Sequence, residues 1–182
     1  MMKKGSAILI LAAAGAVSVC QGGETGAVAK PQAMEKKISA MSDCDRIQAL
    51  IKGHSKGFAA LRREKAHSKL VDVWKARYHL VGDSCQVWGW GAGKYSYMCA
   101  LTSPNRETAR SYYDRAKAVA GRCLGKDWQL EESMRQQGEG FKAQFSRQGG
   151  GTAVGVQAVA TPGLFKTEWT TYFFVGDPND ML

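Results

Sequence analysis

The sequence predicts an α+β domain, in which an antiparallel sheet of about five to six strands carries two helices on one face and two disulfides staple the fold. Apolar residues recur at helical spacing in two segments and alternate with polar residues in several others. Their order along the chain is helix, strands, helix, strands. This order is typical of α+β domains rather than of folds in which strands and helices alternate one by one.

The N-terminus predicts an export signal followed by a linker. Lys3 and Lys4 precede the apolar run 7–17, which matches the central region of a secretory signal and falls short of the about 20 residues of a transmembrane helix. We therefore expect a signal peptide over 1–20, a flexible tether over 21–41 and a single domain over 42–182.

The signal is compatible with two modes of processing. Residues 17–20 read Val-Ser-Val-Cys and resemble a bacterial lipobox, in which the Cys is lipidated, although Val19 departs from the usual Gly, Ala or Ser. Ordinary cleavage after Ala16 or Ser18 is the alternative. Lipidation of Cys20 leaves an even number of thiols for an oxidising compartment. We therefore expect a periplasmic lipoprotein at the outer membrane, which touches the membrane only through its lipid.

The first helix of the domain is expected over residues 42–65. Ser42 suits an N-cap, and acidic residues follow in the first turn, where the helix dipole favours them. Five apolar residues then follow helical spacing: Ile47, Leu50, Ile51, Phe58 and Leu61. Gly53 and Gly57 weaken the middle of this helix, where a kink is the alternative to a straight axis.

A β-hairpin is expected in the next segment. Alternation of apolar with polar residues begins near residue 73, and the segments 85–90 and 94–101 flank a Gly-Ala-Gly turn centred on Ala92. Cys85 and Cys99 are equally far from Ala92, so we expect them to lie opposite each other and to form a disulfide. In the chain-entropy account such a short loop contributes about 3 kcal/mol.

A second helix is expected to start at Ser103-Pro104 and to end at Gly125, because a capping hydroxyl before a proline begins helices and glycine ends them. Three strands are expected after it, over 141–145, 154–160 and 166–175, separated by Gly- and Pro-containing turns. Cys44 and Cys123 remain as a pair. Their disulfide follows by elimination and is one of three connectivities open to four cysteines.

The sequence lacks the motifs of common catalytic and metal sites. It has no G-x-S-x-G nucleophile motif, and the glycines around Lys94 lack the first Gly and the Ser or Thr of a phosphate loop. The domain's cysteines are too widely spaced for a zinc site, and Glu131-Glu132 is a lone acidic pair. We therefore expect a protein that is not an enzyme and that holds no metal and no cofactor.

Charge and aromatic content point to binding. Without Lys3 and Lys4 the chain carries 23 basic against 16 acidic residues, and outside the cytoplasm such a surface favours anionic lipids, polymers or acidic proteins over nucleic acid. Aromatic residues dominate protein interfaces. They concentrate in the expected hairpin, so we expect the partner-binding residues to be Trp88, Trp90, Tyr95 and Tyr97.

The signal residues Lys3 and Lys4, the segment 17–20 and a disulfide-stapled domain without catalytic motifs together resemble the periplasmic immunity lipoproteins that accompany secreted bacterial toxins. The resemblance implies an inhibitor that covers the active site of a toxin with a rigid surface. The alternative is an envelope accessory lipoprotein that binds an anionic polymer or lipid. Its expected contact residues are basic: Lys75, Arg77, Lys94, Arg106 and Arg110.

Overall fold

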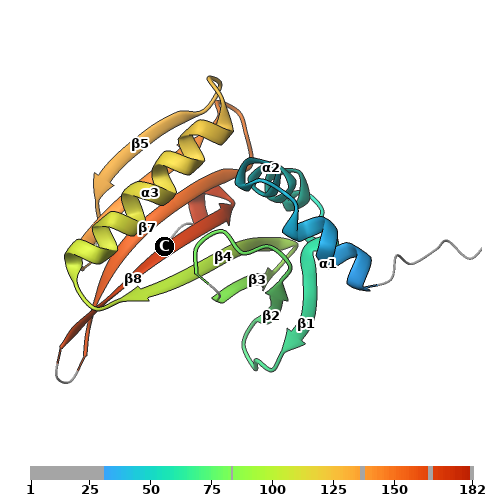
Figure 1. Ribbon diagram of the computed structural model, residues 1–182, viewed down its shortest axis with the longest axis horizontal. Coiled ribbons are helices and arrows are strands. Elements are labelled where there is room, and N and C mark those ends of the chain that lie inside the picture. The colour runs from blue at the N-terminus through green and yellow to red at the C-terminus, as the bar shows by residue number, and fades with distance from the viewer. Residues whose placement is uncertain (1–30, 83, 136–137, 164–165, 181–182) are drawn as a thin grey trace, which may run out of the picture.

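The computed structural model describes residues 31–82, 84–135, 138–163 and 166–180 (Figure 1). The expected signal peptide over 1–20, with Cys20, lies outside the described residues. The elements, in chain order, are α1 (Pro31–Ser39), α2 (Asp43–His54), η1 (Ala59–Leu61), β1 (Arg62–Ala66), β2 (Asp72–Ala76), β3 (Ser84–Gly91), β4 (Lys94–Ser103), α3 (Arg106–Leu124), β5 (Gln129–Met134), β6 (Gly140–Ser146), β7 (Ala153–Pro162), β8 (Thr167–Gly176) and η2 (Pro178–Asp180).

The described strands form one antiparallel sheet of eight strands in the order β1-β2-β3-β4-β8-β7-β6-β5. The fold class and the antiparallel sheet agree with expectation, but the expected strand number of about five to six is wrong. The sheet consists of two four-strand meanders that join where β4 pairs with β8. One helix precedes each meander, α2 the first and α3 the second, so the domain has two halves of the same topology.

The two strands that were not expected are the outer strands of the sheet. β1 has the sequence Arg-Arg-Glu-Lys-Ala, and every residue of β5 is exposed. Edge strands with charged side chains are common because they discourage pairing with other chains. Such strands show no alternation of apolar and polar residues, and this alternation was the only signal available for a strand.

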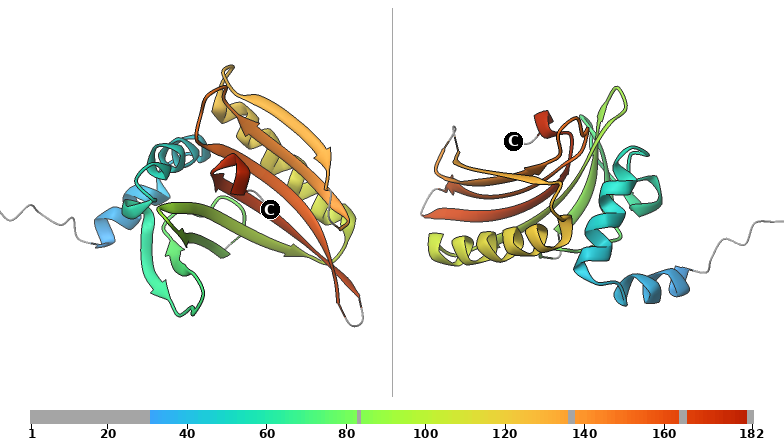
Figure 2. Two further views of the ribbon diagram at one scale, coloured as in Figure 1. Left: turned by 180° about the vertical axis from the view of Figure 1, so that it is seen from behind. Right: turned by 90° about the horizontal axis from the view of Figure 1, so that it is seen from above.

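Helices α2 and α3 cover one face of the sheet, and η2 lies on the opposite side (Figure 2). The main core lies between the helices and the sheet. It unites Ile47 and Leu50 of α2 with Tyr113 of α3 and with Phe173 and Val175 of β8, all nearly or fully inaccessible to solvent. We call the sheet face opposite α2 and α3 the open face.

Helix α2 starts where expected and ends earlier. Ser42 forms a capping box with Asp45, whose backbone N–H donates to the Ser42 hydroxyl while its carboxylate accepts from the Ser42 N–H. The helix ends at His54 instead of running to residue 65. Gly57 and Phe58 both have a φ of 58°, which is left-handed and turns the chain into η1 and β1.

Part of the expected tether is helical and docked. Residues 31–39 form α1, which corrects the expectation of a flexible tether up to residue 41. The Glu35 carboxylate lies 4.0 Å from the Arg63 guanidinium and 3.9 Å from that of Arg77. These ion pairs connect α1 to the first meander.

The start of α3 also corrects the sequence expectation. The N-cap is Asn105, whose side-chain oxygen accepts from the Thr108 N–H, whereas Ser103 is the last residue of β4 and donates to the Trp169 carbonyl. Strand β4 pairs with β8 as far as Ser103, which keeps this residue in the sheet. The C-cap at Gly125 is as expected.

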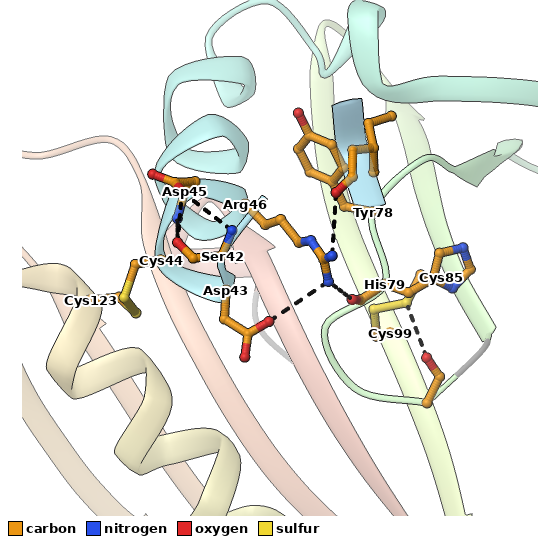
Figure 3. Close-up of polar contacts among 12 residues, drawn as sticks. Ser42, Asp43, Cys44, Asp45, Arg46, Tyr78, His79, Cys85, Cys99 and Cys123 are labelled. Carbon is orange, nitrogen blue, oxygen red and sulfur yellow. Dashed lines mark hydrogen bonds and ion pairs between the residues drawn. A yellow bond between two sulfur atoms is a disulfide. The ribbon is translucent and has the colours of Figure 1, made fainter. Parts of the chain in front are cut away.

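Both expected disulfides are present. Cys85 and Cys99 lie directly opposite each other on β3 and β4, with their Cα atoms 4.0 Å apart. Cys44 at the start of α2 bonds to Cys123 at the end of α3, with a Cα separation of 4.8 Å (Figure 3). One bridge therefore closes the hairpin and the other joins the helices of the two halves.

Candidate functional site

The four aromatic residues of the hairpin divide between the two faces of the sheet. Trp88 pairs with Ser96, and Val87 pairs with Tyr97. Because successive side chains of a strand point to opposite faces, Trp88 and Trp90 lie on the open face, whereas Tyr95 and Tyr97 lie on the face that the helices cover. The hairpin therefore presents one pair of aromatic residues, not four, on the open face.

Tyr97 is a core residue, which corrects its assignment to the partner-binding set. Its side chain is fully buried, and its hydroxyl donates to the Tyr78 carbonyl at 2.9 Å. Burial raises the pKa of the Tyr97 phenol far above its ordinary value, although the nearby Arg46 opposes the shift. A fully buried side chain of this kind is not available to a partner.

Tyr95 also has a structural role. The Arg62 guanidinium lies 4.0 Å from the centroid of the Trp74 ring and 4.4 Å from that of Tyr95, so that the cation sits against both rings. The Arg62 Nε atom donates to the Gly57 carbonyl at 2.9 Å. This arrangement ties β1 to β2, β4 and the end of α2, and it engages one face of the Tyr95 ring.

Trp88 and Trp90 form an ordered pair on the open face. Their ring centroids are 5.1 Å apart in a stacked arrangement. The Trp88 indole N–H donates to the Gln86 side-chain oxygen at 3.0 Å, and the Trp90 indole N–H donates to the Ser96 hydroxyl at 2.6 Å. Trp90 nevertheless remains 41% exposed. Both rings are therefore held in one orientation while accessible surface remains.

Beside the pair on the open face lie the half-buried side chains of Gln86, Met98 and Tyr172, next to Phe174 and Gln157, which are buried. The pairing register places Gln86 beside Met98 and Met98 beside Phe174. A parallel row runs from Tyr172 to Gln157. Met98 and Tyr172 were not among the predicted site residues, because alternation gives the face of a residue only relative to its own strand and the pairing of β4 with β8 cannot be read from either strand alone.

Most of the basic residues considered for polyanion binding have carboxylate partners. Arg77 pairs with Glu35 at 3.9 Å, Arg106 with Glu139 at 3.4 Å and Arg110 with Asp114 at 2.9 Å. Lys75 lies on β2 and Lys94 at the hairpin turn, far along the sheet order from α3 and β6. The five residues therefore do not form one continuous unpaired basic surface.

The acidic pair does not converge. Glu132 lies on the helix side of β5, where its carboxylate accepts from the Tyr113 hydroxyl at 3.0 Å and from the Lys117 ammonium at 2.7 Å. These hydrogen bonds lower the pKa of Glu132, and the hydrogen bond from Lys117 has the larger effect. Glu131 follows the alternation of the strand to the other face. The two carboxylates thus do not flank a common substrate position.

In the described part of the chain, no group of three or more His, Cys, Asp or Glu residues has an arrangement able to hold a metal ion. No helix of the described residues is long and apolar enough to cross a membrane. Comparison with known proteins gave no match to a protein-family model, to a curated protein or to a solved structure. The residues of the chain itself are therefore the basis of any functional proposal.

Proposed function

We propose that this protein is a non-catalytic protein of the bacterial envelope that binds a protein partner, and that the partner is a secreted toxin which it inhibits. The observation that carries the proposal is the stacked pair Trp88 and Trp90 on the open face. Ordered aromatic side chains with exposed surface are the residues that most often dominate the binding energy of protein interfaces.

The surroundings of the pair support a rigid binding surface. The Cys85–Cys99 disulfide and the β3–β4 pairing restrain the hairpin, and the hydrogen bonds to Gln86 and Ser96 hold the rings. A side chain that is already ordered loses less conformational entropy on binding, where immobilisation costs about 0.5–1.5 kcal/mol per side chain. Met98 extends this surface with apolar area, and Tyr172 and Gln86 add groups that can form hydrogen bonds.

The test uses the exported, processed protein with its disulfides intact. The protein is immobilised and exposed at physiological salt to the secreted fraction of the source organism, and the captured protein is assayed for a toxic activity that this chain suppresses. We expect Trp88→Ala and Trp90→Ala each to weaken capture at least tenfold, since hot-spot residues contribute about 2 kcal/mol or more.

Trp128→Ala is the matched control, because Trp128 is half-buried against Arg147 in the segment between α3 and β5 and does not lie on β3. Full capture by this control together with loss in the Trp88 and Trp90 variants supports the proposal. Equal capture by all variants contradicts it. Capture of polysaccharide or lipid alone, released by modest salt, favours the anionic-ligand alternative, because screening removes exposed charge interactions.

A further inference from the structure

A concave site lies on the helix side of the sheet, where α2 and α3 meet β4 and the segment that precedes β3. Its volume is about 220 Å³, and we call it the α2–α3 groove. The lining is mostly apolar, and its two charged residues are Asp43 and Arg115. The other lining residues are Ile47, Leu80, Val81, Gly82, Leu101, Tyr112, Ala116, Val119 and Phe173. None of these residues belongs to the Trp88 and Trp90 surface.

The groove has a buried floor and partly exposed walls. Ile47, Ala116 and Phe173 are almost inaccessible to solvent and form the floor. Tyr112 and Val119 of α3 and the opposing Leu80, Val81 and Leu101 are only half-buried. Apolar side chains from three separate parts of the chain thus leave surface exposed around a single hollow, which is the usual form of a small-molecule site.

Arg46 holds the loop wall of the groove in place (Figure 3). Its guanidinium donates to the His79 carbonyl and to the Ile38 carbonyl, each at 3.3 Å, and lies 3.7 Å from the Asp43 carboxylate. The His79 contact fixes the chain immediately before Leu80 and Val81. The Cys44–Cys123 disulfide fixes α2 against α3. These contacts therefore hold the walls of the groove in place.

The charges at the groove are unequally engaged. Asp43 has Arg46 as its ion-pair partner. Arg115 is exposed, and within the described ranges it has neither an ion pair nor a hydrogen bond. A guanidinium donates paired hydrogen bonds that match the two oxygens of a carboxylate. The lining thus combines an apolar hollow with the exposed Arg115 guanidinium, which has no ion-pair partner among the residues that the structure describes.

We propose that the α2–α3 groove binds a single-chain amphiphile with a carboxylate head, of the fatty-acid class. The apolar tail occupies the hollow and the carboxylate pairs with Arg115. A cavity of about 150 Å³ lined by Leu, Ile and Phe binds benzene, so a volume of 220 Å³ accommodates part of an acyl chain of medium length. This site is independent of the proposed binding of a toxin.

The probe for this site is decanoate, titrated into the processed protein by calorimetry and followed by the chemical shifts of backbone amides. We expect saturable binding of one decanoate, with shifts at residues 80–82 and 112–119. Decyltrimethylammonium, which has the same tail length and a cationic head, is expected not to bind, because its charge repels Arg115.

Two variants separate the tail contact from the head contact. Val119→Trp fills the hollow from a half-buried position and is expected to abolish decanoate binding, whereas Arg115→Gln is expected to weaken it roughly tenfold by removing the charge-assisted hydrogen bonds. Arg122→Gln is the control, because Arg122 is exposed on α3 and does not line the groove. Circular dichroism establishes that each variant is folded.

The proposal fails if decanoate does not saturate, if the shifts lie outside the groove, or if decyltrimethylammonium binds equally well. The proposal is also overturned if the Arg115→Gln variant binds decanoate as tightly as the Arg122→Gln variant does. The shifts in the unsubstituted protein decide the location of the site even if Val119→Trp does not fold.

Discussion

The missing side chain of Gly140 determines how closely β6 approaches β7. A Cβ atom at this position would lie 2.1 Å from the Ala158 carbonyl oxygen, which belongs to the backbone of the neighbouring strand. We expect Gly140→Ala to lower the free energy of unfolding by more than about 2 kcal/mol, as substitutions that force backbone shifts do. Urea unfolding measures the change.

Gly151→Ala is the control for this substitution, because a Cβ atom at Gly151 has no atom within 4 Å beyond those of the residue itself and its two chain neighbours. It is expected to stay within about 0.5 kcal/mol of the unsubstituted protein. A Gly140→Ala variant as stable as Gly151→Ala would mean that the two strands separate at little cost.

Glu132 gives stability a defined dependence on pH. The hydrogen bond from Lys117 and then that from Tyr113 lower the pKa of its carboxyl in the folded state. A lowered pKa contributes stability above the unfolded value, near 4.5, and this contribution disappears as the pH falls through the folded value. The group is largely exposed, so we expect Glu132→Gln to cost only about 0.5 kcal/mol at pH 7.

The check is a comparison of urea unfolding of the two proteins at pH 7 and at pH 3. The difference between them should narrow at pH 3, because that pH lies below the unfolded value near 4.5 and the contribution of the lowered pKa decreases as the carboxyl of the unfolded chain becomes protonated. A difference that does not depend on pH would assign the effect to packing around Tyr113 instead of to the charge of Glu132.

Individual residues show what a sequence can and cannot reveal. The pairing of Cys85 with Cys99 followed from their equal distance to Ala92, because the two residues belong to one hairpin and local spacing determines their register. The burial of Tyr97 could not be predicted in the same way. Alternation predicts that Tyr97 and Ser96 face opposite sides, but only the position of the helices decides which side is buried.

At the scale of elements, β1 depends on one cation. Arg62 sits between Trp74 of β2 and Tyr95 of β4 and hydrogen bonds to the Gly57 carbonyl. Lys has no planar fork of donors, so it cannot replace both the stacking and the hydrogen bonds. We expect Arg62→Lys to lower the free energy of unfolding by about 1 kcal/mol.

Arg63→Lys provides the comparison, because Arg63 is the next residue of β1, is exposed and contacts no aromatic ring of the described residues, and a lysine keeps the charge of its long ion pairs with Glu35 and Glu64. Urea unfolding measures both variants, and the change in the free energy of unfolding caused by Arg63→Lys should be close to zero. If both substitutions have the same cost, the contact of Arg62 with the aromatic rings does not hold β1 to the sheet.

Elements were predictable where they have one buried and one exposed face. The alternation around Trp74, around Phe141 and around Phe173 indicated β2, β6 and β8, and the capping box at Ser42 marked the start of α2. The end of α2 was not predictable from periodicity, because Phe58 and Leu61 continue the helical spacing while the backbone has already turned at Gly57. Tertiary packing keeps these side chains in the core although α2 has ended.

At the scale of the whole molecule, the two halves share one core. Strand β8 of the second half pairs with β4 of the first along seven registered residue pairs. Buried Thr171 on β8 donates to the Ala109 carbonyl of α3 at 3.3 Å, and the core cluster contains residues of both helices. The halves therefore have the same topology but no separate interiors, and the domain should unfold as one cooperative unit.

Removing each disulfide tests whether the domain unfolds cooperatively, because the two disulfides close chain segments of different length. Cys44 and Cys123 are separated by 79 residues and join the two halves, whereas Cys85 and Cys99 are separated by 14 residues within one hairpin. In the chain-entropy account a disulfide stabilises by restricting the unfolded chain, about 3 kcal/mol for a 15-residue loop and about 4.7 kcal/mol for a 100-residue loop.

We therefore expect Cys44→Ala with Cys123→Ala to lower the free energy of unfolding by about 1.5 kcal/mol more than Cys85→Ala with Cys99→Ala does. Urea unfolding followed by near- and far-ultraviolet circular dichroism measures both pairs. The two signals should remain coincident in each variant, because the β4–β8 pairing and the shared core still join the halves. Separate transitions in the variant without Cys44 and Cys123 would mean that the long-range disulfide, rather than the core, makes the two halves unfold together.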